Sequence, residues 1–312
     1  MTNSDISQIK HALKETVIIF GPTGNVASVV ARTAHAKGCN VVLAMRNIAK
    51  NVPGLIEGSE SDFERIQADL KEPESVRATI EKSGAKRAFI YFINGTSDHM
   101  RSSIEALRTA GIELVVFLST SSVLCNGRNI PPSDITTFLH AQVEIGLDEV
   151  FGPTGYLSLR PSRFTSTFTR YRRVINVGHV KLYEPDIEKD YITPTDIGRV
   201  GGSILAQGMR NGQNHVFLFG PSQISLRDAV VFIAKALGKP VQVSSLTAEE
   251  AVNDYMTKGL AKDIAEYVVS RAAIRPAGDL YKKHIDNVSL YTGSPPITFQ
   301  KWVQENKAIF HL

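Results

Sequence analysis

The fold is decided near the start of the chain by the stretch Val17-Ile18-Ile19-Phe20-Gly21-Pro22-Thr23-Gly24-Asn25-Val26-Ala27. Its first four residues form an apolar run that ends at a glycine, which predicts a buried strand. Residues 27–37 are small or helix-compatible, and Gly38 follows them as a helix C-terminal residue should. A second apolar run covers residues 41–45. The predicted order is strand, glycine loop, helix, strand.

The glycine loop has the spacing of a phosphate-binding turn. Gly21 permits a tight turn, Gly24 lets a ligand approach the backbone, and the small Ala27 lets the helix pack on the strand. The helix start then offers unpaired N–H groups and a favourable dipole to a pyrophosphate. We predict a dinucleotide-binding loop, whose contact residues are Gly21, Thr23, Gly24, Asn25 and Val26.

The end of the second strand indicates which dinucleotide is bound. NAD-binding folds place Asp or Glu there to accept from the ribose hydroxyls, whereas a cation suits the 2′-phosphate of NADP. This chain has no acid between Asn40 and Ile56, and Arg46 and Lys50 follow the strand. Because a guanidinium can pair with a phosphate through two donors, the sequence predicts NADP(H) held by Arg46 and Lys50.

Strands and helices alternate up to about residue 160. Strands are predicted over residues 63–69, 87–93, 114–118 and 156–159, and helices over residues 73–84, 96–111 and 135–150, with Ser75 as a candidate cap of the first helix. This pattern predicts an α/β fold with a Rossmann-type, doubly wound parallel sheet. We expect an NADP-binding domain over residues 1–160.

The rest of the chain, residues 161–312, is expected to form a smaller, mostly helical substrate lobe, some of whose strands return to the first sheet. Residues 163–190 show little periodicity. Helices are predicted over residues 196–209, 226–238, 247–273 and 298–310, and a strand over residues 216–219. Ser225 is a predicted helix cap, and Thr247 with Glu250 fits a capping box.

Further candidate cofactor contacts follow the predicted strands, at the sheet edge where such folds bind ligands. They are Asp69, Leu70, Phe92, Ile93, Asn94, Ser119 and Thr120. Asp69 is suited to accept from the adenine amino group, and a helix-capping role is an equal alternative for it.

The composition is that of an ordinary folded protein. Of 312 residues, 43% are hydrophobic and 21% charged, with a formal net charge of +4. The tightest basic group is Arg170, Arg172 and Arg173. It fits a solvated helix end better than a nucleic-acid footprint, and an anion-binding rim around a substrate pocket is the second interpretation. We expect no nucleic-acid partner.

Compartment and metal content are also constrained by the sequence. Cys39 and Cys125 cannot make a disulfide framework, residues 1–15 carry no apolar run, and no stretch is apolar for long enough to cross a bilayer. We expect a cytoplasmic protein without a signal peptide or a membrane partner. The eight histidines form no cluster with ligand spacing, so no metal is expected. Nothing in the sequence indicates the oligomeric state.

Several motifs in order along the chain carry a family resemblance. They are Ile18-Ile19-Phe20-Gly21-Pro22-Thr23-Gly24, Leu159-Arg160-Pro161-Ser162-Arg163-Phe164, Thr195-Asp196-Ile197-Gly198 and Thr298-Phe299-Gln300-Lys301-Trp302. In these the chain resembles the NmrA-like family of atypical short-chain dehydrogenases/reductases. The resemblance implies NADP(H), with Pro161, Ser162 and Phe164 beside the nicotinamide. Family members are NADPH-dependent reductases or NADP-binding, redox-sensing regulators.

The resemblance also locates the candidate catalytic residues. Ordinary short-chain reductases use a serine after the fifth strand and a Tyr-x-x-x-Lys pair on the next helix, whose tyrosine delivers a proton. By comparison with the family, Ser121 matches the serine, Thr136 stands at the tyrosine position and His140 at the lysine position. The standard pair is absent. His140 could bind the nicotinamide ribose or donate a proton near neutral pH, and an ordinary, partly buried histidine is the alternative.

These observations predict an NADPH-dependent reductase of a small aromatic or conjugated carbonyl, enone or quinone, held between Ser121, His140 and the lobe after Phe164. Phe164 and Phe168 are candidate apolar walls, and Tyr171 and Tyr191 are candidate phenols that could replace the missing tyrosine. The alternative is a non-catalytic, NADP(H)-sensing regulator that binds a protein partner. A redox-neutral or dehydratase-like reaction is a third interpretation.

Overall fold

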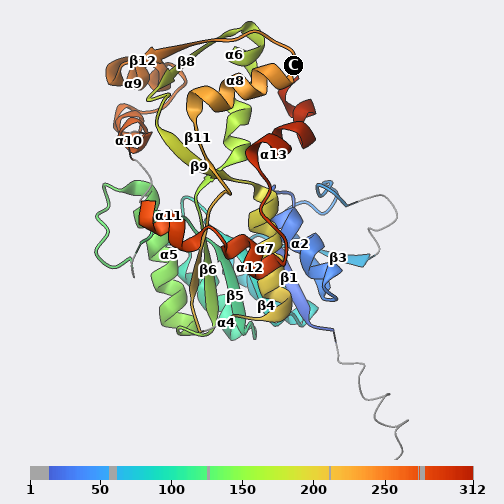
Figure 1. Ribbon diagram of the computed structural model, residues 1–312. Coiled ribbons are helices and arrows are strands. Elements are labelled where there is room, and N and C mark those ends of the chain that lie inside the picture. Colours follow the sequence, from blue (N-terminus) through green and yellow to red (C-terminus); the bar gives the residue numbers. More distant parts are fainter. Residues whose placement is uncertain are drawn as a thin grey trace, which may run out of the picture. The chain divides into compact units, whose positions relative to one another are not determined.

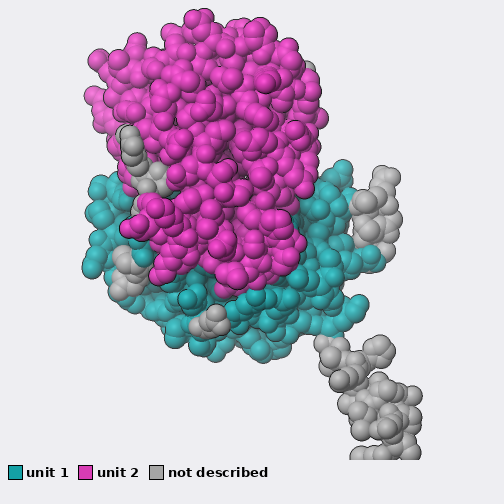
Figure 2. All heavy atoms as spheres, in the orientation of Figure 1, with its two compact units in different colours: residues 1–160, 197–216 teal, residues 161–196, 217–312 magenta. Residues whose placement is uncertain are grey.

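The computed structural model describes residues 14–55, 62–124, 127–210, 212–272, 274 and 278–311 (Figure 1). Cys125 lies outside the described residues. The chain divides into two compact units (Figure 2). Unit 1 comprises residues 1–160 and 197–216, and unit 2 comprises residues 161–196 and 217–312.

A seven-stranded sheet in the order β10-β6-β5-β4-β1-β2-β3 forms the centre of unit 1 (Figure 1). Its strands are β1 (Thr16–Phe20), β2 (Asn40–Met45), β3 (Phe63–Gln67), β4 (Arg87–Tyr91), β5 (Leu114–Leu118), β6 (Tyr156–Pro161) and β10 (His215–Leu218). The neighbouring pairs from β3 to β6 are parallel. The predicted α/β fold with a doubly wound parallel sheet is confirmed. The strand order reverses between β1 and β4, where such sheets open a crevice at the carboxyl ends of the strands.

The edge strand β10 also runs parallel to its neighbour. Ser158 donates to the carbonyl of Asn214 at 2.8 Å, and Ser162 donates to the carbonyl of Leu218 at 2.9 Å. Both partners advance by the same four residues, which is the register of parallel strands.

Helices cover both faces of this sheet. They are α2 (Ala27–Ala36), α3 (Pro73–Ser83), α4 (Arg101–Thr109), α5 (Ile135–Phe151) and α7 (Pro194–Gln207). Residues of α3, α4 and α5 share one apolar cluster with the strands, including Ile80, Leu107 and Leu147. Glycines let α7 approach α2 closely, because a Cβ on Gly198 would lie 2.5 Å from the Cβ of Val29.

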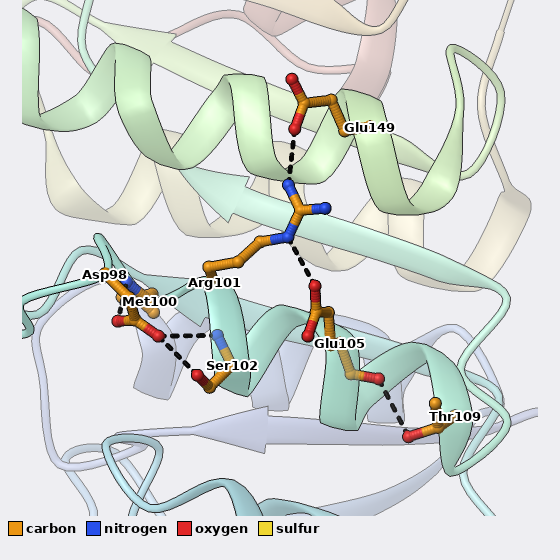
Figure 3. Close-up of polar contacts among 7 residues, drawn as sticks. All are labelled: Asp98, Met100, Arg101, Ser102, Glu105, Thr109 and Glu149. Carbon is orange, nitrogen blue, oxygen red and sulfur yellow. Dashed lines mark hydrogen bonds and ion pairs between the residues drawn. The ribbon is translucent and has the colours of Figure 1, made fainter.

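The helix predicted from residue 96 begins only at Arg101, because Asp98 closes a turn in front of it (Figure 3). Asp98 accepts hydrogen bonds from the backbone N–H of Ser102 at 2.9 Å and from its hydroxyl at 2.6 Å. His99 and Met100, the two residues before Arg101, have φ of 52° and 68°, which is incompatible with a right-handed helix. Arg101 then joins Glu105 of α4 to Glu149 of α5.

The prediction that Ser75 caps α3 is wrong. Glu72 occupies the N-cap position of α3 and makes no side-chain capping bond. Ser75 lies inside the helix, and its hydroxyl accepts a hydrogen bond from the backbone N–H of Asp69 at 3.0 Å. Pro73 starts the helix without a capping side chain, because its fixed φ is already helical.

Unit 2 combines short strands with helices. Its strands are β7 (Arg163–Phe164), β8 (His179–Tyr183), β9 (Glu188–Ile192), β11 (Gln223–Ser225) and β12 (Gln242–Leu246). Its helices are η2 (Thr165–Tyr171), α6 (Arg172–Val177), α8 (Leu226–Ala236), α9 (Ala248–Thr257), α10 (Lys262–Ala272), α11 (Gly278–His284), α12 (Asn287–Thr292), α13 (Phe299–Glu305) and η3 (Lys307–Phe310). Strand β9 pairs with β7 and β11, and β12 pairs with β8.

Two predicted helix caps of unit 2 are confirmed. The Ser225 side chain accepts from the backbone N–H of Asp228 at the start of α8. Thr247 and Glu250 exchange the two hydrogen bonds of a capping box at the start of α9. By contrast, residues 163–190, which showed little periodicity, contain four or more elements of two to seven residues. Elements this short complete too few periods to leave a pattern in the sequence.

Candidate functional site

The glycine loop leaves β1 in a conformation that only its sequence allows. Gly21 has φ of 64°, and its carbonyl accepts from the N–H of Gly24 at 3.0 Å, which closes the turn. Helix α2 starts at Ala27 with no side-chain cap and no acidic residue in its first turn. Thr23, Gly24 and Asn25 are exposed at the tip. The loop therefore presents backbone and a positive helix end to solvent, as phosphate binding requires.

A cavity of about 310 Å³ lies beside this loop. It is lined by Phe20, Gly21, Pro22, Thr23, Ala44, Met45, Arg46, Asn47, Lys50, Ala68, Asp69, Leu70 and Tyr91. The structure thus brings together six of the predicted contact residues: Gly21, Thr23, Arg46, Lys50, Asp69 and Leu70. They come from the ends of β1, β2 and β3, which are neighbours in the sheet.

Arg46 and Lys50 lie on a loop whose backbone is hydrogen-bonded to a side chain of β3. The Nη1 of Arg65, on β3, donates to the carbonyl of Ile48 at 2.8 Å and to that of Lys50 at 3.2 Å. The Asn47 side chain accepts from the N–H of Ala49 at 3.0 Å, which tightens the same turn. Arg46 and Lys50 are therefore presented by a fixed backbone. Sequence reasoning did not find Arg65, whose role depends on the pairing of β2 with β3.

Asp69 is the only carboxylate among the described residues that line this cavity. Its Oδ1 accepts from the N–H of Lys71 at 3.0 Å, so it closes a turn after β3. It does not cap α3, whose N-cap residue is Glu72. Asp69 is half-buried at the cavity wall, and its second carboxylate oxygen can accept from a ligand donor.

Tyr91 is a cavity residue that the sequence did not single out. It ends β4, and the pairing of Ile19 with Phe89 places Gly21 opposite Tyr91. A Cβ on Gly21 would lie 2.5 Å from Cε1 of this ring, so the glycine makes room for the tyrosine. Burial raises the pKa of Tyr91, while Arg46 lowers it and Asp69 raises it. The hydroxyl therefore stays protonated near the two charged groups at neutral pH.

His140 lies where β4 and β5 end, between two aromatic rings. Its ring centroid is 4.9 Å from that of Phe92 and 6.3 Å from that of Phe117. Nδ1 lies 2.8 Å from the carbonyl oxygen of Thr136 and therefore carries the proton, because a carbonyl only accepts. Burial lowers the pKa of His140, against the opposing effects of Thr136 and Glu144. The ring is neutral at pH 7, with Nε2 as an acceptor.

Ser119 serves a buried ion pair. Its hydroxyl donates to Oε1 of Glu144, and its backbone N–H donates to the carbonyl of Leu159 at 2.8 Å. Glu144 in turn binds Arg160 through contacts of 2.6 Å and 3.2 Å. All three side chains are almost completely buried. This network fastens α5, which carries His140, to the ends of β5 and β6.

The remaining predicted residues fall in both units. In unit 1, Thr120 and Ser121 follow β5 and are half-buried, as are Phe92 and Ile93 after β4, and Asn94 is exposed. Unit 2 holds Pro161, which is buried, Ser162, whose hydroxyl donates to Asp190, and Phe164, which is half-buried.

Among the described residues, no group of three or more His, Cys, Asp or Glu side chains could hold a metal ion. In the same part of the chain, no helix is apolar for long enough to span a membrane.

The sheet order and the glycine loop define a Rossmann-type nucleotide-binding fold. A model of the NmrA-like family matches residues 13–287, and the chain belongs to this family. It is 35% identical to nitrogen metabolite regulation-like protein bik4 of Gibberella fujikuroi, across 92% of this chain and 95% of that protein. It is 23% identical to the NAD(P)H azoreductase of Xenophilus azovorans, across 94% of this chain and 99% of that protein.

A solved structure shows the same fold. The NADPH-dependent quinone oxidoreductase QOR2 of Escherichia coli, complexed with NADPH, matches with a TM-score of 0.71 and 17% identity. The match covers 93% of this chain and 99% of that chain.

Proposed function

We propose that the chain is an NADPH-dependent reductase of a small aromatic or conjugated carbonyl, enone or quinone. The observation that carries the proposal is the cavity at the ends of β1, β2 and β3. Two cations, Arg46 and Lys50, line it on a loop that Arg65 holds by hydrogen bonds, and the carboxylate of Asp69 also lines it. This charge pattern suits an adenosine that bears a 2′-phosphate. It suits an unphosphorylated ribose less well.

The residues present fit NADP(H) group by group. The exposed backbone of residues 23–25 and the start of α2 suit the pyrophosphate. Arg46 and Lys50 suit the 2′-phosphate, and Asp69 suits the adenine amino group. Bound NADPH would supply a hydride to an electron-poor carbon of the substrate.

The candidate residues near the nicotinamide, His140 and Ser121, would then bind the coenzyme ribose and position the substrate. Neutral His140 offers Nε2 as an acceptor, which suits a ribose hydroxyl better than it suits proton donation. The hydroxyl of Ser121 suits a substrate oxygen. The aromatic neighbours Phe92 and Phe117 hold the His140 ring in one orientation.

Relatives support the reductase. The azoreductase and the quinone oxidoreductase both act with reduced nicotinamide by their names, and both cover nearly the whole chain. Quinones belong to the substrate class proposed for this chain, and azo groups resemble them as electron-poor conjugated systems.

A non-catalytic NADP(H)-sensing regulator that binds a protein partner is the second candidate. It is favoured by the name of the 35% identical relative, a nitrogen metabolite regulation-like protein. Thr136 and His140, in place of the tyrosine and lysine of ordinary short-chain reductases, also favour it, because neither supplies a phenolic proton near the hydride.

Two measurements on the full chain separate these outcomes. Calorimetric titration with NADPH and NADH should show preferential binding of NADPH, and failure of both to bind would overturn both candidates. Loss of NADPH absorbance should then be followed with a panel of naphthoquinones, enones and aryl ketones. Turnover of a panel member supports the reductase. Tight NADPH binding without any turnover would replace it with the regulator.

A further inference from the structure

A second cavity, of about 220 Å³, lies wholly within unit 2. The charged residues that line it are all cations: Arg163, Arg170, Lys189 and Arg271. Its tyrosines are Tyr171, Tyr183, Tyr191 and Tyr255. No Asp or Glu is among the described residues of its wall. Such a one-sided arrangement attracts an anion.

Three of these cations, Arg163, Arg170 and Lys189, donate to uncharged oxygens. Arg163 donates to the carbonyl of Arg271 at 3.4 Å, and Arg170 donates to the hydroxyl of Tyr171 at 2.8 Å. The ammonium of Lys189 donates to the carbonyl of Ala272. These bonds orient the groups but leave their positive charge to be balanced by something else.

The electrostatics of Lys189 report the same excess of positive charge. Burial, together with the positive charges of Arg163 and Arg170, lowers its pKa to about 8 against the opposing effect of Glu184. Other carboxylates near the wall are Asp190 and Asp254. Asp190 offsets part of the charge of Arg163, and Asp254 pairs with Lys258, so the four cations of the wall still outnumber the carboxylates near them. A bound anion would relieve the repulsion among the cations.

The rest of the wall is aromatic. The ring of Phe168 lies 4.8 Å from that of Tyr191 and 6.2 Å from that of Tyr171, and Phe168 and Tyr191 are almost fully buried. The volume is below the roughly 300–1,000 Å³ usual for drug-sized ligands, so the occupant is small. Flat rings beside guanidinium groups suit a planar body that ends in a planar anion.

We propose that this cavity binds a small aromatic carboxylate, with the carboxylate toward Arg163 and Arg170 and the ring against Phe168 and Tyr191. The site goes beyond the proposed reductase activity, because none of its lining residues lines the cavity at the ends of β1, β2 and β3.

The test is calorimetric titration of the full chain, without coenzyme, with 2-naphthoate, with its uncharged analogue 2-naphthamide, and with inorganic phosphate. We expect naphthoate to bind and the other two probes to bind at least about tenfold more weakly. Arg170→Gln should weaken naphthoate binding about tenfold or more, because it removes a charge-assisted contact. Arg173→Gln is the matched control, since Arg173 is exposed on the next helix and does not line the cavity.

Four results would overturn the proposal. They are absence of naphthoate binding, equal binding of naphthamide, equal binding of phosphate, and equal losses in the two arginine variants. Thermal unfolding without ligand checks that Arg170→Gln folds, and Lys189→Met provides a second lining variant with the same expected loss. Because no coenzyme is present, failure here leaves the proposed reductase activity untouched.

Discussion

Glu144 and Arg160 form an ion pair of 2.6 Å with only 6% and 4% of their side chains exposed. The pair joins α5 to β6, and the hydroxyl of Ser119 adds β5 to the connection. Because α5 also carries His140, this buried pair fixes the histidine relative to the ends of the central strands. Because both partners are buried, removing one of them should leave the other charged group buried without a partner.

Glu144→Gln should lower the free energy of unfolding by about 3–5 kcal/mol, because it leaves the guanidinium of Arg160 buried without a counter-charge. Urea unfolding followed by circular dichroism measures this. Glu149→Gln is the matched control on the same helix, since its pair with Arg101 is exposed and should contribute less than about 1 kcal/mol. Similar losses in the two variants would show that burial does not set the strength of the pair.

Arg46→Glu should weaken NADPH binding far more than NADH binding, because it places a carboxylate where the 2′-phosphate is proposed to lie. A loss of about 2 kcal/mol or more in the NADPH binding free energy is expected from one lost charge-assisted contact. Arg77→Glu, on the exposed surface of α3, is the charge-matched control. Equal losses for the two coenzymes would remove Arg46 from the proposed site.

The sequence predicted the central sheet and the cavity residues for a clear physical reason. Strands β1, β2 and β5 are nearly continuous apolar runs, as strands buried on both faces must be, and the glycine loop constrains the turn after β1. Arg46 and Lys50 could be predicted as cofactor contacts because a charge at one strand end distinguishes NAD from NADP, and both line the cavity.

What the sequence missed depends on pairing between distant segments. Arg65 supports the Arg46 loop only because β3 lies beside β2. Tyr91 enters the cavity only because β4 places it opposite Gly21. The cationic cavity of unit 2 gathers residues from short elements, such as β7 and η2, that complete too few periods to be recognised.

His140→Phe should reduce the loss of unfolding free energy that the wild type shows as the pH falls below about 6.5. The folded chain resists protonation of His140, so its contribution to stability is present above the ordinary histidine pKa of about 6.5 and is lost as pH falls through the lowered value. Phenylalanine keeps the packing against Phe92 and Phe117 and removes the titration. Urea unfolding at several pH values tests this.

The comparison of wild type with His140→Phe isolates one group. His284, whose pKa burial also lowers, is present in both proteins and cancels. Parallel profiles of unfolding free energy below neutral pH would contradict the assignment of a half-buried, neutral His140. Weaker NADPH binding by the variant would support the proposed contact between His140 and the nicotinamide ribose.

Gly198→Ala should destabilise the chain by about 1–3 kcal/mol, because the new Cβ would lie 2.5 Å from the Cβ of Val29 and force α7 away from α2. Gly278→Ala is the control, since no described atom lies within 4 Å of its Cβ position. Thermal unfolding of both variants tests the close approach of the helices. A stable Gly198→Ala protein would show that α7 can shift without cost.

Lys189→Met should remove a rise in stability on the alkaline side. The pKa of Lys189 is about 8 in the folded chain, below its ordinary value of 10.5, so the unfolded chain binds the proton more tightly between these values. Stability therefore increases with pH in this window and is lost as pH falls through it. The pKa of Tyr191 is raised to about 12, so its ionisation opposes stability only above about pH 10.

Measured between about pH 8 and pH 9.5, the wild type should gain about 1 kcal/mol of unfolding free energy that Lys189→Met does not gain, after allowance for solvent screening. Lys181→Met, on the exposed side of β8, is the matched control and should keep the wild-type slope. An aromatic carboxylate bound beside Lys189 should reduce the slope of the wild type as well, because the anion restores a counter-charge and raises the pKa of the lysine toward its ordinary value. A slope unchanged by Lys189→Met would mean that another group titrates in this window. The pH dependence of stability would then contradict an excess of positive charge around Lys189 in the cavity of unit 2.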